Sequence, residues 1–378
     1  MKGNVSYIAP ERALVSSNIK EIQPYATISS RNKILSGESH NKLAPLKLDW
    51  NESTLPPSKA VKKAIKDSVE NDQNILNWYP ELYSNSLRVK LGEYCNRTAE
   101  EILVTNGSDD ALELICKVFL DPDDQVLVPY PTYTHFITYV QSRGADLRKV
   151  ELADPFKTDI TSILSNVTPD TKLIYIVNPN NPTGVLLSKK QISTICTIAS
   201  HSIVIVDEAY FEFAGETVMD LIDSNPNLII TRTFSKAWAL AGLRIGYLVT
   251  NSGLIDQLAK VLNPKSVSVM AQVAAFAALS DKKYMENYVF EVSVSKKMLL
   301  DFFVRFNVKA FDSHANYIMV QHPELNTLLE KMESENIFVR DRSSFKNLPN
   351  FFRITLGNIS QTEELIRRLE RVFSSISH

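Results

Sequence analysis

Six short runs rich in valine and isoleucine, separated by longer amphipathic stretches, constrain the fold of this chain more than any other feature. Strands that are covered on both faces are apolar along their whole length, which is typical of parallel sheets. Helices between such strands indicate βαβ units. We therefore expect an α/β fold with a mainly parallel sheet, whose strands are residues 102–104, 125–128, 173–177, 203–206, 228–230 and 245–249.

The two ends of the chain differ from this middle part. Residues 1–57 are polar and contain five prolines, and a helical apolar pattern begins only at Ser58. Near Lys283 a long charged helix begins, and strand and helix patterns typical of a smaller α+β domain follow it. We predict an N-terminal arm over residues 1–57 that packs with this small domain, a large domain over 58–275 and the small domain over 276–378.

Composition excludes several classes of function. The chain has 44% hydrophobic and 22% charged residues and a net charge of −2, without the basic stripe of a nucleic-acid-binding protein. No apolar run is as long as a membrane span, and the N-terminus lacks the features of a secretion signal. The three cysteines and six histidines have no disulfide-like or metal-ligand spacing. We expect a cytoplasmic protein without a membrane, nucleic-acid or metal partner.

Polar residues follow four of the expected strands, at the point where each strand ends. Open parallel sheets bind ligands beyond the carboxyl ends of their strands. Ser108 begins a helix whose first amides can bind an anion, Asp207 and Tyr210 supply a carboxylate and a phenol, and Lys236 supplies an amine. The four turns are residues 105–110, 178–184, 207–210 and 233–236.

Lys236 and Arg244 together indicate a particular cofactor. A lysine attacks a carbonyl group when its ammonium is partly desolvated or lies near other cations. The planar guanidinium of Arg244, eight residues later, suits a phosphate. An amine for an aldehyde beside a guanidinium for a phosphate indicates pyridoxal phosphate. Each residue also has a plainer interpretation, since most lysines are surface residues and most Ser-Asp helix starts are only caps.

The order of these motifs resembles that of the fold-type-I pyridoxal-phosphate-dependent aminotransferases, and in particular of the histidinol-phosphate aminotransferase branch. The resemblance runs from about residue 20 to the C-terminus. The Asn-Pro-Asn-Asn-Pro-Thr-Gly motif at 178–184 and the Ser-Lys to Arg-Ile-Gly motif at 235–246 are together highly specific to such enzymes. The other matching segments are residues 48–52, 78–80, 106–109, 129–133, 207–213, 315–317, 339–341 and 353–357.

The resemblance implies roles for the residues that surround the cofactor. Lys236 would bond the cofactor aldehyde and carry the proton that leaves the substrate Cα, and Asp207 would pair with the ring nitrogen. Tyr210 and Asn181 would hydrogen-bond the phenolic oxygen of the ring, and Tyr133 would stack on its face. The phosphate would lie among Gly107, Ser108, Asp109, Ser235 and Arg244.

The resemblance also implies how substrates and a second subunit take part. Arg353 would bind the carboxylate of the amino donor, and Tyr25 and Arg340 would bind a substrate phosphate. Asn51 belongs to a segment that lines the pocket in the family. Tyr79 would reach the cofactor phosphate of a partner subunit, which makes the active unit a homodimer.

One departure from the family pattern leaves the substrate open. Trp50 stands where relatives have a small residue, so histidinol phosphate is not the assured substrate. We expect an aminotransferase that takes an amino group from glutamate and transfers it to a small phosphorylated keto compound. The alternatives are another phosphorylated amine, an aromatic 2-oxo acid, decarboxylation of serine or threonine phosphate, and a non-enzymatic protein that binds pyridoxal phosphate.

Overall fold

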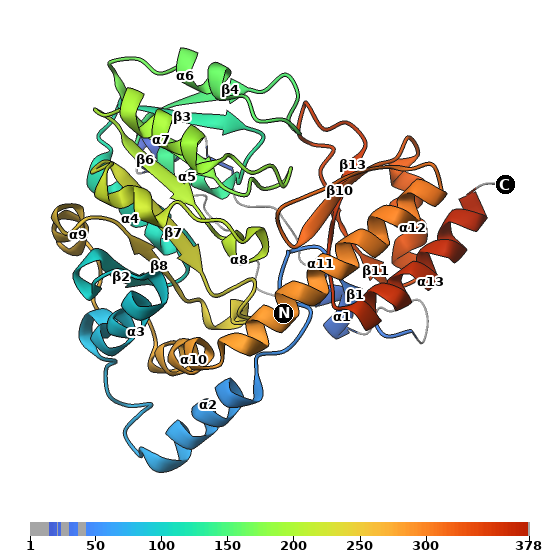
Figure 1. The fold of residues 1–378 in the computed structure, drawn as a ribbon, viewed down its shortest axis with the longest axis horizontal. Coiled ribbons are helices and arrows are strands. Elements are labelled where there is room, and N and C mark those ends of the chain that lie inside the picture. Colours follow the sequence, from blue (N-terminus) through green and yellow to red (C-terminus); the bar gives the residue numbers. More distant parts are fainter. Residues whose placement is uncertain (1–14, 21, 24–29, 37–42, 377–378) are drawn as a thin grey trace, which may run out of the picture.

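A computed structural model describes residues 15–20, 22–23, 30–36 and 43–376 of the chain (Figure 1). Within this part a seven-stranded sheet carries helices on both faces, and a smaller antiparallel sheet with its own helices lies beside it (Figure 1). The expected α/β fold with a mainly parallel large sheet and a smaller α+β region is confirmed.

The large sheet has the strand order β2-β8-β7-β6-β5-β3-β4. Strand β8 is antiparallel to both of its neighbours, and the other adjacent pairs are parallel. All six expected strands form. The strands are β2 (Ile102–Thr105), β3 (Gln125–Tyr130), β4 (Asp146–Glu151), β5 (Thr171–Val177), β6 (Ile203–Asp207), β7 (Leu228–Thr233) and β8 (Gly246–Val249).

Strand β4 was not expected from the sequence. It lies at the edge of the sheet, and Val150 is its one buried residue. Because an edge strand is covered less than a central one, charged residues are tolerated in it and the apolar run disappears. Its sequence Asp-Leu-Arg-Lys-Val-Glu therefore lacks the pattern that identifies the central strands.

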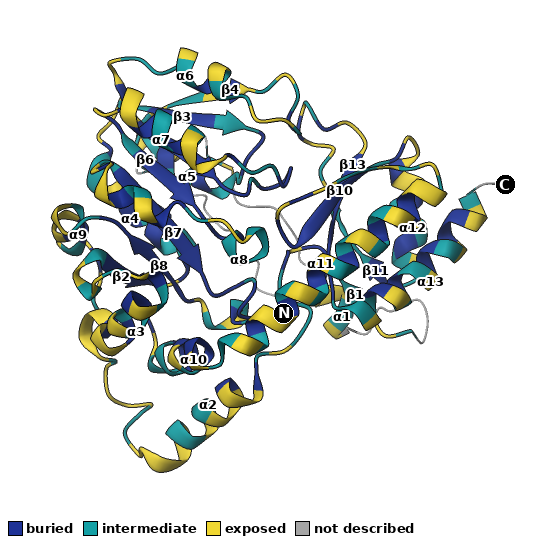
Figure 2. Cartoon of the chain, in the orientation of Figure 1, coloured by how far each residue is buried: buried dark blue, intermediate teal, exposed yellow. Residues whose placement is uncertain are grey.

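Two hydrophobic cores cover the two faces of the large sheet. The strands of this sheet are mostly buried in Figure 2. Side chains alternate between faces along a strand, so Ile102 and Val104 belong to one core and Leu103 to the other. Burying each valine, leucine or isoleucine contributes about 1.5–3 kcal/mol. Helices α4 (Ser108–Phe119), α5 (His135–Ser142) and α9 (Ser252–Ala259) cover one face, and α2 (Lys59–Asn71), α3 (Asn85–Cys95), α6 (Ile160–Ser165), α7 (Lys189–Ile198) and α10 (Val269–Ser280) cover the other.

The second sheet is antiparallel, with the order β12-β13-β10-β9. A third hydrophobic core packs its strands against long helices near the C-terminus. The strands are β9 (Lys309–Phe311), β10 (Tyr317–Gln321), β12 (Arg340–Asp341) and β13 (Phe351–Thr355), and the helices are α11 (Lys282–Arg305), α12 (Leu325–Ser334) and α13 (Ile359–Ile376).

Part of the N-terminal arm lies against this C-terminal region. Strand β1 (Leu46–Lys47) pairs in parallel with β11 (Ile337–Phe338), and Lys33 in α1 (Arg31–Ser36) forms an ion pair with Glu333 in α12. The expected boundary at residue 275 falls inside α10, and the domain limits stay a prediction. The remaining elements are α8 (Phe211–Ala214) and 3-10 turns at Ser17–Ile19, Leu82–Ser84, Ala99–Glu101, Met219–Asp223 and Ala241–Leu243.

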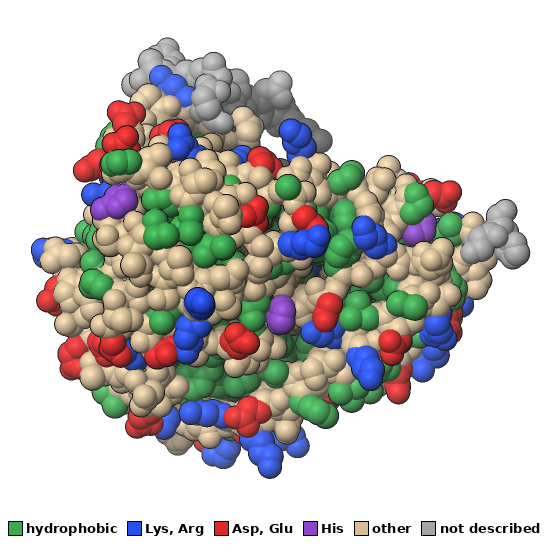
Figure 3. Space-filling model, turned by 45° about the horizontal axis from the view of Figure 1, so that its top comes forward, with side chains coloured by type: hydrophobic (Ala, Val, Ile, Leu, Met, Phe, Trp, Pro, Cys, Tyr) green, Lys and Arg blue, Asp and Glu red, His purple; other side chains and the backbone are tan. Residues whose placement is uncertain are grey.

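Two properties of the described residues bear on partners. None of their helices is both long enough and apolar enough to cross a membrane. On the face drawn in Figure 3, basic and acidic side chains are interspersed.

Candidate active site

The carboxyl ends of β5, β6 and β7 open into a cavity of about 690 Å³, where Val177, Asp207 and Thr233 form part of its wall. This volume lies in the usual range of small-molecule sites. Residues of β12 and β13 and the segment 50–52 line it from the other side. Among the predicted site residues, the cavity brings together Asn51, Ser108, Asp109, Tyr133, Asn181, Asp207, Tyr210, Ser235, Lys236, Arg244, Arg340 and Arg353.

Two predicted site residues that the structure describes, Gly107 and Tyr79, are not in the wall of this cavity. Gly107 lies directly behind it as the residue before α4, with a φ of 85°. A Cβ at Gly107 would come within 2.8 Å of Nη2 of Arg244, so glycine permits this close approach. Tyr79 lies between α2 and α3 and is 80% exposed. Tyr25 lies outside the described residues.

Lys236 follows β7 and extends into the cavity. Its Nζ donates a 3.0 Å hydrogen bond to the carbonyl oxygen of Trp50 and lies 5.8 Å from the ring centroid of Tyr210. The loop that carries it is anchored by the buried side chains of Phe234 and Trp238. Both partners of the amine are uncharged, so neither contact is an ion pair.

Asp207 ends β6 as a buried carboxylate. Tyr175 donates a 2.9 Å hydrogen bond to Oδ2, and the backbone amide of Ala209 donates to Oδ1 at 3.1 Å. Burial has the largest effect and raises the pKa of Asp207 to about 6, although both hydrogen bonds act in the opposite direction. A cationic group beside this carboxylate would stabilise its ionised form.

A chain of hydrogen bonds joins the phenol at the end of β6 to an arginine of β13. The hydroxyl of Tyr210 accepts from Nδ2 of Asn51 at 3.1 Å and from Nδ2 of Asn181 at 3.4 Å. Oδ1 of Asn181 accepts from Nη1 of Arg353 at 2.6 Å. Nη2 of Arg353 donates to the carbonyl of Asp49 at 2.9 Å. Four segments that are distant in sequence therefore meet at one point.

A second group of hydrogen-bond donors lines the cavity. The first residue of α4, Ser108, lines the cavity, and Gly107 before it has no side chain that could cap the helix amides. Nη1 of Arg244 lies 3.3 Å from Oγ of Ser235. Helix N-terminal amides, a hydroxyl and a guanidinium together form the donor set that binds a phosphate.

The carboxylate of Asp109 holds two residues of this site in place and does not itself bind an anion. Its carboxylate accepts a 2.8 Å hydrogen bond from the hydroxyl of Tyr133 and pairs with Nη2 of Arg244 at 3.2 Å. A carboxylate repels a phosphate. The side chain of Asp109 therefore orients Arg244 and Tyr133, and only its backbone amide can donate to an anion.

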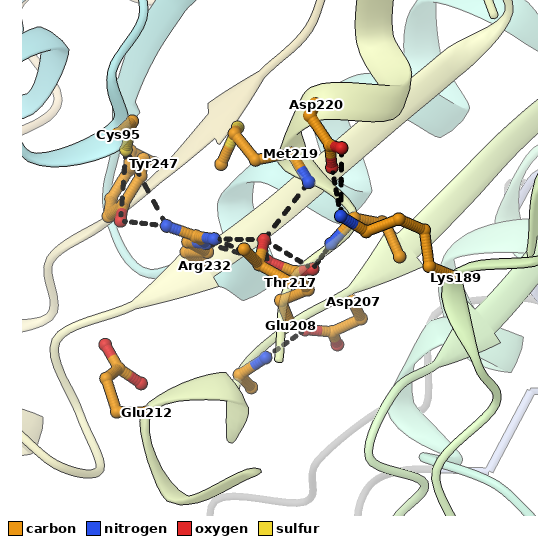
Figure 4. Close-up of polar contacts among 12 residues, drawn as sticks. Cys95, Lys189, Asp207, Glu208, Glu212, Thr217, Met219, Asp220, Arg232 and Tyr247 are labelled. Atoms are coloured by element: carbon orange, nitrogen blue, oxygen red, sulfur yellow. Dashed lines mark hydrogen bonds and ion pairs between the residues drawn. The ribbon is translucent and has the colours of Figure 1, made fainter. Parts of the chain in front are cut away.

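A buried ion pair cross-links the strands that carry Asp207 and Lys236 (Figure 4). Arg232 of β7 donates from Nε and Nη2 to Oε2 of Glu208, at 2.9 and 2.7 Å. The backbone amide of Val218 donates to Oε1 of Glu208 at 2.7 Å. A buried pair with satisfied partners favours one arrangement of its surroundings, because breaking it leaves an uncompensated charge. It holds the ends of β6 and β7 together.

Several residues near the cavity were missed by sequence reasoning. Tyr175 lies in the apolar part of β5, and Arg232 lies between two threonines at the end of β7. A charged residue inside a central strand is the signal that could have identified Arg232. Arg342 follows Arg340 by two positions, which places both on one face of an extended strand. Arg31 also lines the cavity, and no local pattern indicates it.

The residues present fit pyridoxal phosphate. The amine of Lys236 suits an aldehyde, the buried carboxylate of Asp207 suits a protonated ring nitrogen, and the donor set around Arg244 suits a phosphate. Among the described residues, no group of three or more histidine, cysteine or acidic side chains is placed to hold a metal. An α/β sheet with these groups at its strand ends defines the fold-type-I pyridoxal-phosphate enzymes.

Comparison with known proteins specifies the family. The model of the aminotransferase class I and II family matches residues 44–369, so the chain belongs to this family. It is a pyridoxal-phosphate-dependent aminotransferase similar to histidinol-phosphate aminotransferases.

Two relatives match almost the whole chain. A dihydroxyacetone phosphate transaminase of Campylobacter jejuni is 36% identical over 361 residues, which are 94% of this chain and 96% of the relative. A histidinol-phosphate aminotransferase of Methanocaldococcus jannaschii is 31% identical over 369 residues, with the same coverage of both chains.

Solved structures share the fold. The histidinol-phosphate aminotransferase of Sinorhizobium meliloti, in complex with pyridoxal-5'-phosphate, superposes with a TM-score of 0.86 at 23% identity, over 96% of this chain and 98% of that one. The L-threonine-O-3-phosphate decarboxylase of Porphyromonas gingivalis superposes with a TM-score of 0.72 at 24% identity, over 86% and 99%. Transferases and a decarboxylase thus share this fold.

Proposed function

We propose that the chain transfers an amino group from glutamate to a small phosphorylated keto compound. The observation that carries the proposal is a pair of arginines on adjacent strands. Arg340 of β12 and Arg353 of β13 are directly opposite each other, and both line the cavity that contains Lys236 and Asp207. The similarity to a transaminase of dihydroxyacetone phosphate, a small phosphorylated ketone, supports this class of acceptor.

Bound pyridoxal phosphate supplies an electron-accepting ring that stabilises negative charge at the substrate Cα. In this proposal Nζ of Lys236 accepts the proton that leaves Cα and later returns it. Asp207 would keep the ring nitrogen protonated. An ionised carboxylate and a cation ~4 Å apart attract each other by about 4 kcal/mol at an effective dielectric constant of about 20. Tyr210 would donate a hydrogen bond to the phenolic oxygen of the ring, and Tyr133 would pack on the ring face.

The two arginines divide the substrate between them. Arg353, which is buried, binds the carboxylate of glutamate with its planar fork. Arg340 binds the distal anion, which is the second carboxylate of glutamate or the phosphate of the acceptor. Tyr25 is proposed as a further phosphate ligand on the basis of the family resemblance. Asn51 orients Tyr210 through its amide.

Trp50 favours a small acceptor. Its side chain lines the cavity and is 38% exposed, and Nζ of Lys47 lies 5.5 Å from its ring centroid. Lys47 is itself paired with Asp49 at 2.9 Å, which fixes the position of the amine above the ring. A large ring at this position leaves less room for a substrate with an imidazole group.

The proposed active unit is a homodimer. The segment between α2 and α3 exposes Leu76, Trp78 and Tyr79 at 73%, 68% and 80%. Large apolar side chains that are exposed together mark a surface for association. Tyr79 is proposed to enter the cofactor site of the partner subunit. A cytoplasmic location stays a prediction.

Decarboxylation of serine or threonine phosphate is the second candidate, because a decarboxylase of threonine phosphate shares the fold. The same residues would bind such a substrate, and the reaction would depend on which bond of Cα lies perpendicular to the ring. A protein that binds the cofactor without catalysis is disfavoured by membership of the aminotransferase family.

Single-turnover absorbance separates these candidates. Purified enzyme loaded with pyridoxal phosphate is mixed with glutamate, and we expect the visible band to be lost as the amino form of the cofactor appears. Adding a small phosphorylated ketone such as dihydroxyacetone phosphate then restores the band. Release of carbon dioxide from threonine phosphate with the visible band unchanged would contradict amino transfer.

A further inference from the structure

We propose that Arg342 is a second substrate-binding arginine, which forms with Arg340 a clamp that selects a phosphate over a carboxylate as the distal anion. This inference rests on the proposed function and names the residue that determines its specificity.

The backbone places Arg342 beside Arg340 in the wall of the cavity. Strand β12 pairs with β13 in a register that sets Arg340 opposite Arg353 and Asp341 opposite Phe352. The amide of Arg342 donates to the carbonyl of Phe351 at 2.8 Å, so the antiparallel pairing continues one residue further. Side chains two positions apart on an extended strand share a face. Arg340, Arg342 and Arg353 therefore point to the same side, and all three line the cavity.

Aromatic rings lie near the guanidiniums of Arg342 and Arg353. Cζ of Arg342 lies 5.9 Å from the ring centroid of Phe345. Burial raises the pKa of Tyr317 most strongly, and the charges of Arg353 and Arg342 act on the same phenol in the opposite direction. Cζ of Arg353 is 5.2 Å from the ring centroid of Tyr317. The guanidinium of Arg353 thus lies over the buried ring of Tyr317, and that of Arg342 lies over Phe345.

The charges that line the cavity indicate the anion. The carboxylate of Asp109 is paired with Arg244, and that of Glu52 is paired with Lys47. Asp207 lies at the end of β6, and in the proposed function it pairs with the ring nitrogen of the cofactor. Arg340, Arg342 and Arg353, from β12, β13 and the residue after β12, line the same cavity.

A phosphate is best bound by two guanidinium groups, whereas one guanidinium is enough for a carboxylate. A phosphate monoester carries a charge of about −1.5 to −2 at neutral pH and has three terminal oxygens. One guanidinium fork already satisfies both oxygens of a carboxylate. Two neighbouring arginines repel each other, and a doubly charged ligand between them offsets this repulsion. With Arg353 assigned to the donor carboxylate, the clamp assigns Arg340 and Arg342 to the phosphate.

The test measures binding of unreactive ligands to the enzyme loaded with pyridoxal phosphate. Glycerol 3-phosphate is the phosphate probe, and glutarate is the carboxylate probe. In R342Q we expect the Kd for glycerol 3-phosphate to rise ~10- to 100-fold, as for loss of a charged hydrogen-bonding partner. The Kd for glutarate should change less than about threefold, since one guanidinium suffices for a carboxylate.

Two further variants serve as controls. R342K keeps a positive charge without the planar fork, so we expect a smaller rise in the Kd for glycerol 3-phosphate than in R342Q. R367Q changes an exposed arginine of α13 that pairs with Glu364, and it should leave both Kd values unchanged. An unaltered visible absorbance band of the bound cofactor shows that the variants retain an intact site.

The outcomes separate the clamp from the proposed function. If wild type binds glycerol 3-phosphate, and R342Q and R342K bind it with the same Kd as wild type, the clamp is wrong and the proposed function stands. If both probes weaken by the same factor, Arg342 is a general anion ligand and the selectivity is wrong. If wild type does not bind glycerol 3-phosphate and does not aminate dihydroxyacetone phosphate, the proposed function fails and the clamp fails with it.

Discussion

Nη1 of Arg353 donates a 2.6 Å hydrogen bond to Oδ1 of Asn181, and the amide nitrogen of the same asparagine lies 3.4 Å from the hydroxyl of Tyr210. One amide thus links an arginine of β13 to the phenol that follows β6. A carboxylate that binds Arg353 competes for the guanidinium that fixes this amide. If the amino donor binds Arg353 as proposed, its binding and the hydrogen bonding of Tyr210 are coupled through Asn181.

The variant Asn181→Ala tests this coupling. Because Arg353 loses its partner and Tyr210 loses a donor, we expect two changes in one variant. The KM for glutamate should rise ~10-fold or more, as for loss of a charged hydrogen bond, and the pH midpoint of the visible absorbance of the bound cofactor should move. Steady-state kinetics and an absorbance titration measure these changes. Asn166→Ala, whose amide bonds the carbonyl of Ser162 far from the cavity, is the control, and a change in only one property would contradict the coupling.

Asp207→Asn should stabilise the cofactor-free protein above pH 6. Burial raises the pKa of Asp207 from 3.8 to about 6, so the folded chain binds the proton more tightly than the unfolded chain. Stability due to this group is present below pH 4 and is lost as the pH rises to 6, by about 3 kcal/mol in total. Denaturant unfolding at pH 4 and pH 8 should show equal stability at the lower pH and a more stable variant at the higher pH.

Glu212, whose pKa burial raises to about 7, changes stability in the same direction in both proteins. Its contribution cancels in the difference between wild type and Asp207→Asn. If cofactor-free Asp207→Asn is less stable than wild type at pH 8, burial does not destabilise the ionised carboxylate of Asp207 as this account requires.

Trp50→Ala should widen the range of substrates. The indole ring lines the cavity, so its removal leaves space for an imidazole side chain. We expect kcat/KM for histidinol phosphate to rise ~10-fold or more relative to the value for the small phosphorylated ketone, in line with the usual selectivity of apolar pockets. Val304→Ala removes an exposed side chain of α11 and should leave the ratio unchanged. An unchanged ratio in Trp50→Ala would mean that other residues set the size limit.

Mixing two inactive variants tests the proposed homodimer. In a mixed dimer of Tyr79→Ala and Lys236→Ala, one site carries both substitutions and the other carries neither, if Tyr79 crosses the interface. After subunits exchange at equal amounts, about a quarter of the wild-type activity should return. If no activity returns although mixed dimers are present by native mass spectrometry, Tyr79 serves its own subunit or none.

Elements of the fold could be predicted from the sequence where burial on both faces requires an apolar residue at every position. The central strands are covered on both faces, so runs such as Ile203 to Val206 are apolar throughout. Strand β4 escaped prediction because its edge position leaves only Val150 buried. The antiparallel direction of β8 could not be predicted either, since strand direction depends on the path of the connections and not on local composition.

The cofactor side of the site was more predictable than the substrate side. Asp207 ends β6, and Ser108 and Lys236 lie in the turns after β2 and β7, so the ends of the strands bring the three residues together. The approach of Arg340 to Arg353 depends on the register of β12 with β13, and the bond from Tyr175 to Asp207 depends on the neighbouring strand. Such long-range relations have no local pattern in a single sequence.

Reduction of the loaded enzyme with borohydride tests the central claim most directly. The reagent fixes a cofactor that is bonded to a lysine, and the modified lysine is then identified by mass spectrometry of the peptides. The account predicts that the cofactor mass is attached to Lys236 and that Lys236→Ala remains unmodified and colourless. Attachment to another lysine, or a peptide that contains Lys236 without added mass after reduction of coloured enzyme, would contradict it.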